Sequence, residues 1–236
     1  MIKFNKEKSE SYKKSTIEGT GYLAFKDIAK IISDYKINME RVLDLGCGYG
    51  RSSEYLLQYS NNLFGTDINN ECITHCNLSI RNDQFFLNRK SQKYKYTPYT
   101  AIFSILMLFH LENINELRKE LRKCYKSLIN EGHLIIVSGT KNLYSKNYIS
   151  VKGIKKPNYS GDKAILKLEN IDLLVKDIYW SEKQIINTAI KLGFKKAFIE
   201  YPLAEKDLKG YLDEYEIPPY FILILKKTKI KLYEQL

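Results

Sequence analysis

The chain has 236 residues with 44% hydrophobic content, enough for one compact domain with a substantial core, and it shows neither a run of about 18 apolar residues nor a secretory signal. Its formal net charge of +11 is carried by lysines spread along the whole sequence, whereas arginine, the usual side chain for clamping phosphates, is scarce. We therefore favour a solvated basic surface, keep a nucleic-acid patch as the alternative, and expect no membrane partner.

The first 36 residues are predicted to be mainly helical. Residues 22–25, 28 and 31–32 are apolar at helical spacing, which gives this segment one face that can be buried. The segment precedes the first core strand, so it can cover a cofactor or a substrate. Tyr22 is accordingly a candidate substrate contact.

A glycine-rich turn follows the short apolar run Val42-Leu43 and precedes a predicted helix over residues 52–58. Its sequence, residues 44–51, is DLGCGYGR. Three glycines at alternating positions allow a tight turn and let a ligand lie against the backbone. The pattern is Gly-x-Gly-x-Gly, not the Gly-x-Gly-x-x-Gly of dinucleotide-binding folds. Asp44 would repel a pyrophosphate, but it would attract the ammonium and sulfonium groups of S-adenosylmethionine.

A second predicted strand, residues 63–67, ends in Asp67 about one βαβ half-turn after the glycines. A carboxylate at that strand end can accept hydrogen bonds from both hydroxyls of a ribose. The alternative is a structural turn near an unrelated surface carboxylate. The presence of both features at this spacing favours the cofactor site.

On these two motifs, the sequence resembles the class I S-adenosylmethionine-dependent methyltransferases of the small-molecule type, over roughly residues 38–140. The resemblance implies that S-adenosyl-L-methionine is the cofactor and S-adenosyl-L-homocysteine the product. It also implies that the glycine loop lies against the methionine and ribose of the cofactor. The implied cofactor contacts are Asp44, Gly46, Cys47, Gly48, Gly50, Arg51, Asp67, Ile68, Asn88 and Ser104.

A helix is predicted over residues 70–80, and it brings Cys72, His75 and Cys76 within about one turn. No second pair of ligands accompanies them, so we expect a buried helix face and no metal site. The absence of a disulfide-framework spacing indicates reduced thiols in a cytoplasmic protein. The cysteines concerned are Cys47, Cys72, Cys76 and Cys124.

Residues 84–88 and 99–108 are predicted as the third and fourth strands. Asn88 stands where the resembled family often has a residue that meets the adenine amine, and Ser104 lies in the stretch that borders the methionine. His110 ends a segment that resembles the family's post-strand segment. An imidazole there would lie near the transferring methyl and could act as a general base. The alternative is a histidine that only packs or hydrogen-bonds at a helix start.

The later elements continue the alternation of strands and helices. This pattern predicts an α/β, Rossmann-like fold with a seven-stranded, mostly parallel sheet and helices on both faces. The resemblance implies that the last strand is antiparallel and lies between the fifth and sixth. The predicted elements are a helix over 113–129, a strand over 133–137, a helix over 181–192 and strands over 195–201 and 220–225.

Residues 139–180 form a long excursion between the fifth strand and the next helix. Long excursions in compact domains are usually functional, so we predict a substrate lid. Its candidate substrate contacts are Tyr144, Tyr148 and Tyr159. For residues 165–178 the alternative is a hairpin that braces the core, because aromatic and apolar side chains pack cores more often than they bind ligands.

We expect a single methyltransferase domain over residues 1–236. Its predicted parts are an N-terminal helical cap (1–37), a cofactor-binding core (38–140), a lid-like insertion (141–180) and a terminal helix and strand pair (181–236). The expected activity is in-line methyl transfer to the oxygen or nitrogen of a small-molecule acceptor. The alternatives are an RNA methyltransferase and a non-catalytic S-adenosylmethionine-binding partner subunit.

Overall fold

The computed structural model describes residues 16–89, 91–207 and 209–228. The elements are, in chain order, the 3-10 helix η1 (Gly19–Ala24), α2 (Ile28–Asp34), β1 (Val42–Leu45), α3 (Arg51–Leu56), β2 (Leu63–Asp67), α4 (Asn70–Ser79), β3 (Phe85–Leu87), β4 (Tyr99–Ile105), η2 (Leu108–His110), α5 (Ile114–Ser127), β5 (Leu128–Gly139), η3 (Lys141–Tyr144), β6 (Val151–Lys155), β7 (Lys163–Leu168), η4 (Glu169–Ile171), β8 (Leu173–Ile178), α6 (Glu182–Ile190), β9 (Phe194–Glu200), η5 (Asp213–Tyr215) and β10 (Tyr220–Lys227).

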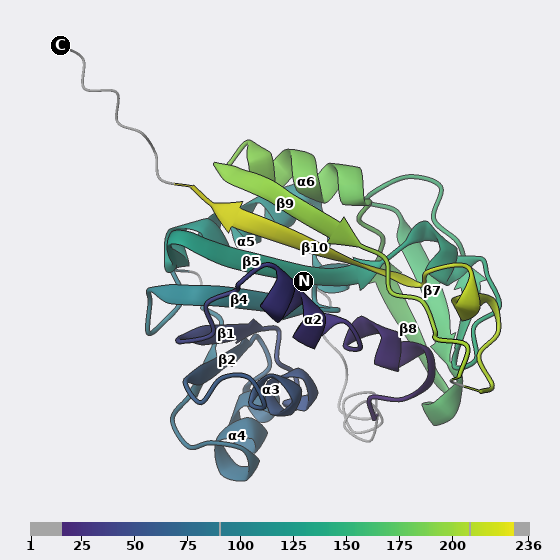
Figure 1. Cartoon of the computed structure of the whole chain (residues 1–236), viewed down its shortest axis with the longest axis horizontal. Coiled ribbons are helices and arrows are strands. Elements are labelled where there is room, and N and C mark those ends of the chain that lie inside the picture. The colour runs from purple at the N-terminus through teal and green to yellow at the C-terminus, as the bar shows by residue number, and fades with distance from the viewer. Residues whose placement is uncertain (1–15, 90, 208, 229–236) are drawn as a thin grey trace.

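The main element of the fold is a seven-stranded sheet with the strand order β3-β2-β1-β4-β5-β10-β9. The pairs from β3 to β5 are parallel, and β10 runs antiparallel to both of its neighbours (Figure 1). The predicted fold class, with an antiparallel last strand inserted between the fifth and sixth, is therefore confirmed.

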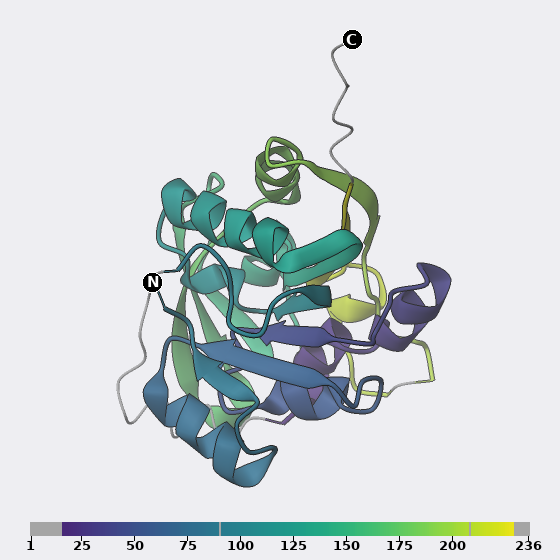
Figure 2. The same cartoon turned by 90° about the vertical axis from the view of Figure 1, so that its left-hand side faces the viewer.

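Helices cover both faces of this sheet, and Figure 2 shows α5 and α6 on one side with α3 and α4 on the other. Ile28 of α2 and Leu56 of α3 belong to the core on one face. Leu117 of α5 and Ile185 of α6 belong to the core on the opposite face. The strands are buried from both sides, which explains why their sequences are continuous apolar runs.

The excursion after β5 contains a second, three-stranded antiparallel sheet with the order β6-β7-β8. It lies at the end of the large sheet where β5 finishes (Figure 1). Its β7–β8 pair is the hairpin that the sequence allowed over residues 165–178. The inward side chains Ala164, Leu166 and Val175 are buried in the same core as Phe109 and Leu23.

The fourth strand is shorter than the predicted range 99–108. Leu106 has a φ of +57°, β4 ends at Ile105, and η2 begins at Leu108. The apolar run outlasts the strand because Leu108 and Phe109 are themselves buried, one in each core. Apolar content thus predicted burial correctly but not the strand end.

The N-terminal segment is less regular than predicted. Between residues 16 and 36 it contains the short elements η1 and α2, and residues 1–15 lie outside the described ranges. The largest of the other boundary differences is at α5 and β5, because α5 ends at Ser127 and β5 runs from Leu128 to Gly139 rather than over 133–137. None of the helices in the described ranges has the length and apolar content needed to cross a bilayer.

Candidate active site

The glycine loop joins the end of β1 to the start of α3. Gly46, Gly48 and Gly50 have φ values of +77°, +52° and +96°, which other residues rarely adopt. A Cβ on Gly46 would lie 2.2 Å from Cγ of Met107. One on Gly50 would lie 2.1 Å from Cδ1 of Ile80, whereas one on Gly48 would meet nothing within 4 Å. The loop is therefore packed at both ends and open at Gly48.

Cys47 is held within the loop through its main chain, and its thiol is buried. Its N–H donates to the carbonyl of Thr66 at 3.1 Å, next to the same contact from Gly46 at 2.8 Å. The side chain is buried in a small cluster with Cys76 and Phe85. Burial raises the pKa of the Cys47 thiol well above its ordinary value, so the thiol stays protonated.

Asp44 lies in β1 beneath the loop and is fully buried. Its Oδ2 accepts hydrogen bonds from the hydroxyls of Ser52 and Ser53, both at 2.6 Å. Its Oδ1 is buried and has no hydrogen-bond partner among the described residues. Burial raises the pKa of this carboxyl to about 6, so the carboxylate form predominates at pH 7.

Asp67 ends β2, the strand beside β1, and faces the same loop. Its Oδ2 accepts from the N–H of Gly48 at 3.1 Å, and its Oδ1 accepts from the N–H of Asn69 at 2.8 Å. Each oxygen keeps a second lone pair. Burial raises the pKa of Asp67, an effect that these backbone hydrogen bonds oppose. Ile68 follows it and is half-buried.

Together these residues fit the predicted cofactor. The unpartnered Oδ1 of Asp44 suits an ammonium group, because a buried carboxylate oxygen is costly to leave without a donor. The open space over Gly48 allows a ligand to approach the backbone. The free lone pairs of Asp67 suit two ribose hydroxyls. No cluster of metal-ligating side chains exists in the described part of the chain.

Two of the expected cofactor contacts have side chains that are directed elsewhere. Asn88 donates to Glu120 at 2.9 Å and accepts from Lys123, so both ends of its amide bind α5. Ser104 is 1% exposed and lies in a small pocket between β4 and α5, which Glu120 and Cys124 also line. For Asn88 and Ser104, only the main chain is left for a role at the cofactor site.

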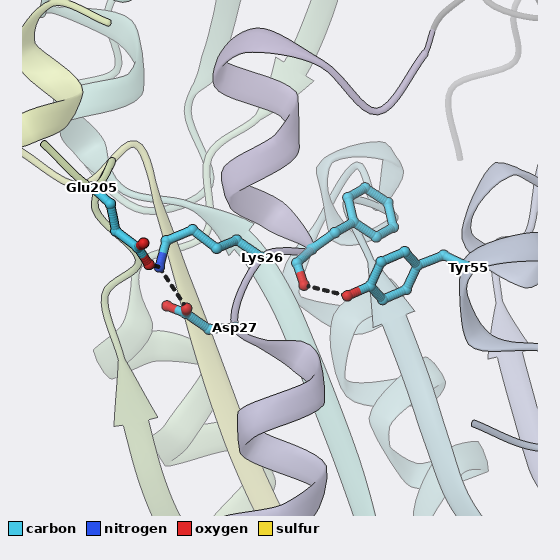
Figure 3. A network of polar contacts seen from close by, with 5 residues as sticks. Lys26, Asp27, Tyr55 and Glu205 are labelled. Atoms are coloured by element: carbon cyan, nitrogen blue, oxygen red, sulfur yellow. Dashed lines mark hydrogen bonds and ion pairs between the residues drawn. The ribbon is translucent and has the colours of Figure 1, made fainter. Parts of the chain in front are cut away.

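The N-terminal cap (residues 19–34, covering η1 and α2) is held in place from two sides (Figure 3). Lys26 pairs with Asp27 and with Glu205 of the β9–β10 loop, both at 2.8 Å. On the other side, the hydroxyl of Tyr55 in α3 donates to the carbonyl of Phe25 at 3.0 Å. The cap is thereby fixed directly beside the helix that leaves the glycine loop.

Two more predicted site residues lie at this cap. Arg51 is the first residue of α3, and its guanidinium carbon is 5.9 Å from the centroid of the Phe25 ring. Tyr22 is half-buried in η1 and packs against the core. Arg51 thus lies at the junction between the cap and the glycine loop, whereas the contact shown for Tyr22 is with the core.

His110 ends η2, just beyond β4, and is half-buried. Its N–H donates to the carbonyl of Met107 at 3.0 Å, and Met107 in turn packs on Gly46 of the loop. Burial lowers the pKa of His110 to about 4, so the imidazole is neutral at pH 7. A neutral imidazole near the loop has the protonation state that a proton acceptor needs.

The three lid tyrosines are not brought together. Tyr144 is buried and donates to Oδ2 of Asp177 at 3.0 Å, and Tyr148 is buried with no partner for its hydroxyl among the described residues. Tyr159 is 78% exposed on the turn between β6 and β7. Burial raises the pKa of Asp177 to about 7.

Sequence reasoning missed the buried carboxyls Glu120, Asp177 and Glu214. Glu214 is fully buried, and its Oε1 accepts from Thr20 of the cap at 2.7 Å and from the N–H of Ile149 at 2.8 Å. Its Oε2 accepts from the N–H of Leu212 at 2.8 Å. A single carboxylate thus joins the cap, the segment before β6 and the β9–β10 loop. An acid in a polar loop sequence gives no local signal of such burial.

Comparison with known proteins identifies a domain in the part of the chain that carries this site. Residues 43–136, from β1 to β5, match the family model of the methyltransferase domain. No curated protein sequence matches the chain at a significant level.

The fold is shared with solved methyltransferases. An S-adenosylmethionine-dependent methyltransferase from Clostridium acetobutylicum gives a TM-score of 0.62 at 13% identity, with 88% of this chain and 92% of the other covered. A protein from Pyrococcus horikoshii gives 0.64 at 19% identity, with 96% and 100% covered. CalS10, an amino pentose methyltransferase from Micromonospora echinaspora solved with S-adenosylmethionine bound, gives 0.59 at 13% identity, with 97% and 99% covered.

At these identities the structures establish a common fold, and the matched domain indicates the activity and its cofactor. Residues 43–136 match a methyltransferase domain, and the seven-stranded sheet with its antiparallel last strand has the fold of the class I S-adenosylmethionine-dependent methyltransferases, as the sequence predicted.

Proposed function

We propose that this methyltransferase acts on a small-molecule acceptor, at oxygen or nitrogen, by in-line methyl transfer. The observation that carries the proposal is the cover over the glycine-loop side of the sheet. The cap and the segment before β6 are joined there through the buried Glu214, and a site beneath such a cover would suit a compact substrate. The amino pentose substrate named for CalS10 supports a small acceptor for this fold.

The proposed roles follow from the geometry. S-adenosylmethionine, when bound, supplies an activated methyl on its sulfonium. Asp44 would bind its ammonium, Asp67 its ribose hydroxyls, and the open backbone at Gly48 would lie against it. Their work is positioning, which alone can remove a large part of the barrier to a bimolecular reaction. An acceptor that arrives protonated also needs a base, and His110 is the proposed one.

Replacement of Gly48 by alanine is expected to weaken cofactor binding more than it weakens the fold. A Cβ at Gly48 meets no protein atom within 4 Å, so it would enter the space proposed for the ligand. The cost to the fold is the positive φ, roughly 1 kcal/mol. Calorimetric titration with S-adenosylmethionine beside a thermal melt separates the two effects. An affinity equal to that of the wild type would place the cofactor away from Gly48.

Replacement of His110 by alanine is expected to lower turnover by about 10²-fold and to leave cofactor affinity nearly unchanged. Because the pKa of His110 is lowered to about 4, deprotonation of its imidazole is complete below pH 5. The rate of the wild type should therefore show no inflection from His110 between pH 5 and pH 8. Steady-state rates of the two proteins across this range test the assignment. An undiminished rate would leave positioning as the whole mechanism.

The substrate class is tested by offering labelled S-adenosylmethionine with a metabolite extract in one reaction and with bulk tRNA and rRNA in another. Label in a metabolite, identified by mass spectrometry, is the expected result. Label in RNA alone would favour the RNA methyltransferase. Cofactor binding without transfer to either would favour the non-catalytic partner subunit.

Two further expectations stay part of this proposal. One is the organisation as a single domain of cap, core, lid and terminal helix with its strand pair. The other is a cytoplasmic location, which is supported by four cysteines that are all buried and free of disulfides.

A further inference from the structure

The outward face of the small sheet carries five lysines, and we call it the lysine face. In the antiparallel pairing, Lys152 of β6 lies opposite Lys167 of β7. Ile165 of β7 has Lys155 of β6 as its partner on one side and Lys176 of β8 on the other. Side chains alternate along a strand, so the inward positions between them are the buried apolar ones. The lysine face consists of Lys152, Lys155, Lys163, Lys167 and Lys176.

The charge of this face is only partly compensated. Lys167 pairs with Asp172 at 2.6 Å and with Glu169 at 3.7 Å. The other four lysines form no ion pair within the described ranges. Two acids beside the strands still feel this charge, because Lys163 helps to lower the pKa of Glu112 and Lys155 helps to lower that of Asp162. The only acid on the three strands is Asp177, which is buried on the inward side. Like charges that lie opposite one another destabilise a sheet, so an anionic partner would reduce the repulsion between these lysines.

The apolar side chains on and beside this face indicate the kind of anion. Ile154, at the bulge in β6, is 53% exposed, and Leu174 of β8 is 50% exposed. The three strands carry no arginine and no aromatic residue, and the exposed Tyr159 lies outside them on the β6–β7 turn. Nucleic-acid surfaces rely on those residues for phosphate clamping and base stacking. Lysines interspersed with aliphatic side chains suit lipid headgroups, because the ammonium groups reach the phosphates while the apolar groups enter the interface.

We infer that the lysine face docks this methyltransferase onto an anionic lipid surface. The small sheet lies at one end of the molecule, beyond the end of β5 (Figure 1). Docking there would turn the outward face of the small sheet toward the membrane. The sequence predicted no membrane partner because lysines dispersed along a chain are brought together only by the register of the strands.

The inference is tested with the full chain and phospholipid vesicles. Each lysine near an anionic surface contributes about fivefold to partitioning, so removal of four should reduce vesicle binding by roughly 10²- to 10³-fold. The face variant carries Lys152→Gln, Lys155→Gln, Lys163→Gln and Lys176→Gln. A control variant with the same loss of charge uses exposed lysines on or beside helices, namely Lys30→Gln, Lys119→Gln, Lys183→Gln and Lys191→Gln.

Sedimentation with vesicles containing phosphatidylglycerol, at about 0.1 M salt, should retain the wild type and the control variant and release the face variant. Pure phosphatidylcholine vesicles should bind none of them. Equal thermal melts and equal S-adenosylmethionine affinity for the three proteins show that folding and the cofactor site are intact. The measurement involves no methyl transfer, so it is independent of the proposed acceptor.

Three results would overturn the inference. One is a wild type that stays in solution with anionic vesicles. Another is an equal loss of binding by the two variants, which would mean that net charge, and not the lysine face, determines vesicle binding. The third is binding of bulk tRNA that only the face variant loses, in the absence of vesicle binding, which would make the face a nucleic-acid surface.

Discussion

Replacement of Asp67 by alanine is expected to weaken S-adenosylmethionine binding by about 10- to 150-fold, which corresponds to about 1.5–3 kcal/mol for charge-assisted hydrogen bonds. The side chain would lose its acceptors for the ribose. It would also release the N–H of Gly48, which Asp67 holds at 3.1 Å. Binding of the ligand and the shape of the loop therefore depend on the same carboxylate. Isothermal titration of the wild type and the variant measures the loss.

The matched control for this experiment is Asp207→Ala, because Asp207 is exposed on the β9–β10 loop. It removes the same charge from the chain at a distance from β2 in sequence and in the sheet. Its affinity for the cofactor should equal that of the wild type. If Asp67→Ala also binds like the wild type, Asp67 is not part of the cofactor site.

Replacement of Asp177 by asparagine is expected to stabilise the protein at pH 8 and to change it little near pH 4. The pKa of this buried carboxyl is raised from 3.8 to about 7 in the folded state. Between these values the folded chain holds a proton that the unfolded chain has lost, so the wild type becomes less stable as pH rises from about 4 to 7. Asparagine does not titrate, and its amide oxygen can still accept from Tyr144. The gain at pH 8 should be on the order of 2–4 kcal/mol.

Urea unfolding of the two proteins at several pH values gives this difference directly. Tyr144→Phe supplies the opposite case, because it removes the hydrogen bond at 3.0 Å that favours the ionised carboxyl. That variant should lose most stability at pH 8. A stability difference between Asp177→Asn and the wild type that is constant with pH would mean that the carboxyl titrates normally.

The parts of the site that local sequence encodes were predictable. The glycine loop needs positive φ at Gly46, Gly48 and Gly50, and only glycine accepts those angles at low cost. Asp67 stands at the end of a short predicted strand, so its place at the carboxyl end of the sheet follows from the pattern. The alternation of strands and helices gave the layered fold for the same reason, because each element carries its own periodicity.

The direction of individual side chains was harder to predict from the sequence, because it depends on contacts between segments that are distant in the chain. Asn88 binds Glu120 and Lys123, more than thirty positions away, although its sequence position suggests the adenine. Burial of Asp177 and the assembly of the lysine face both follow from the register of β6, β7 and β8. Register is set by pairing across the sheet, and a single sequence shows only the strands themselves.

The three hydrogen bonds to Glu214 have a consequence for motion. Oε1 is shared between Thr20 of the cap and Ile149 before β6, and Oε2 holds Leu212. If the cap lifts away, the buried Glu214 carboxylate loses the hydrogen bond from Thr20 and is left with an unsatisfied oxygen. This cost favours simultaneous release of the segment before β6 and of the β9–β10 loop. Opening is then a cooperative local unfolding event with one free energy, rather than the swing of a single hinge. Amide hydrogens of Ile149 and Leu212, far apart in the chain, would exchange with solvent at a common rate set by that event.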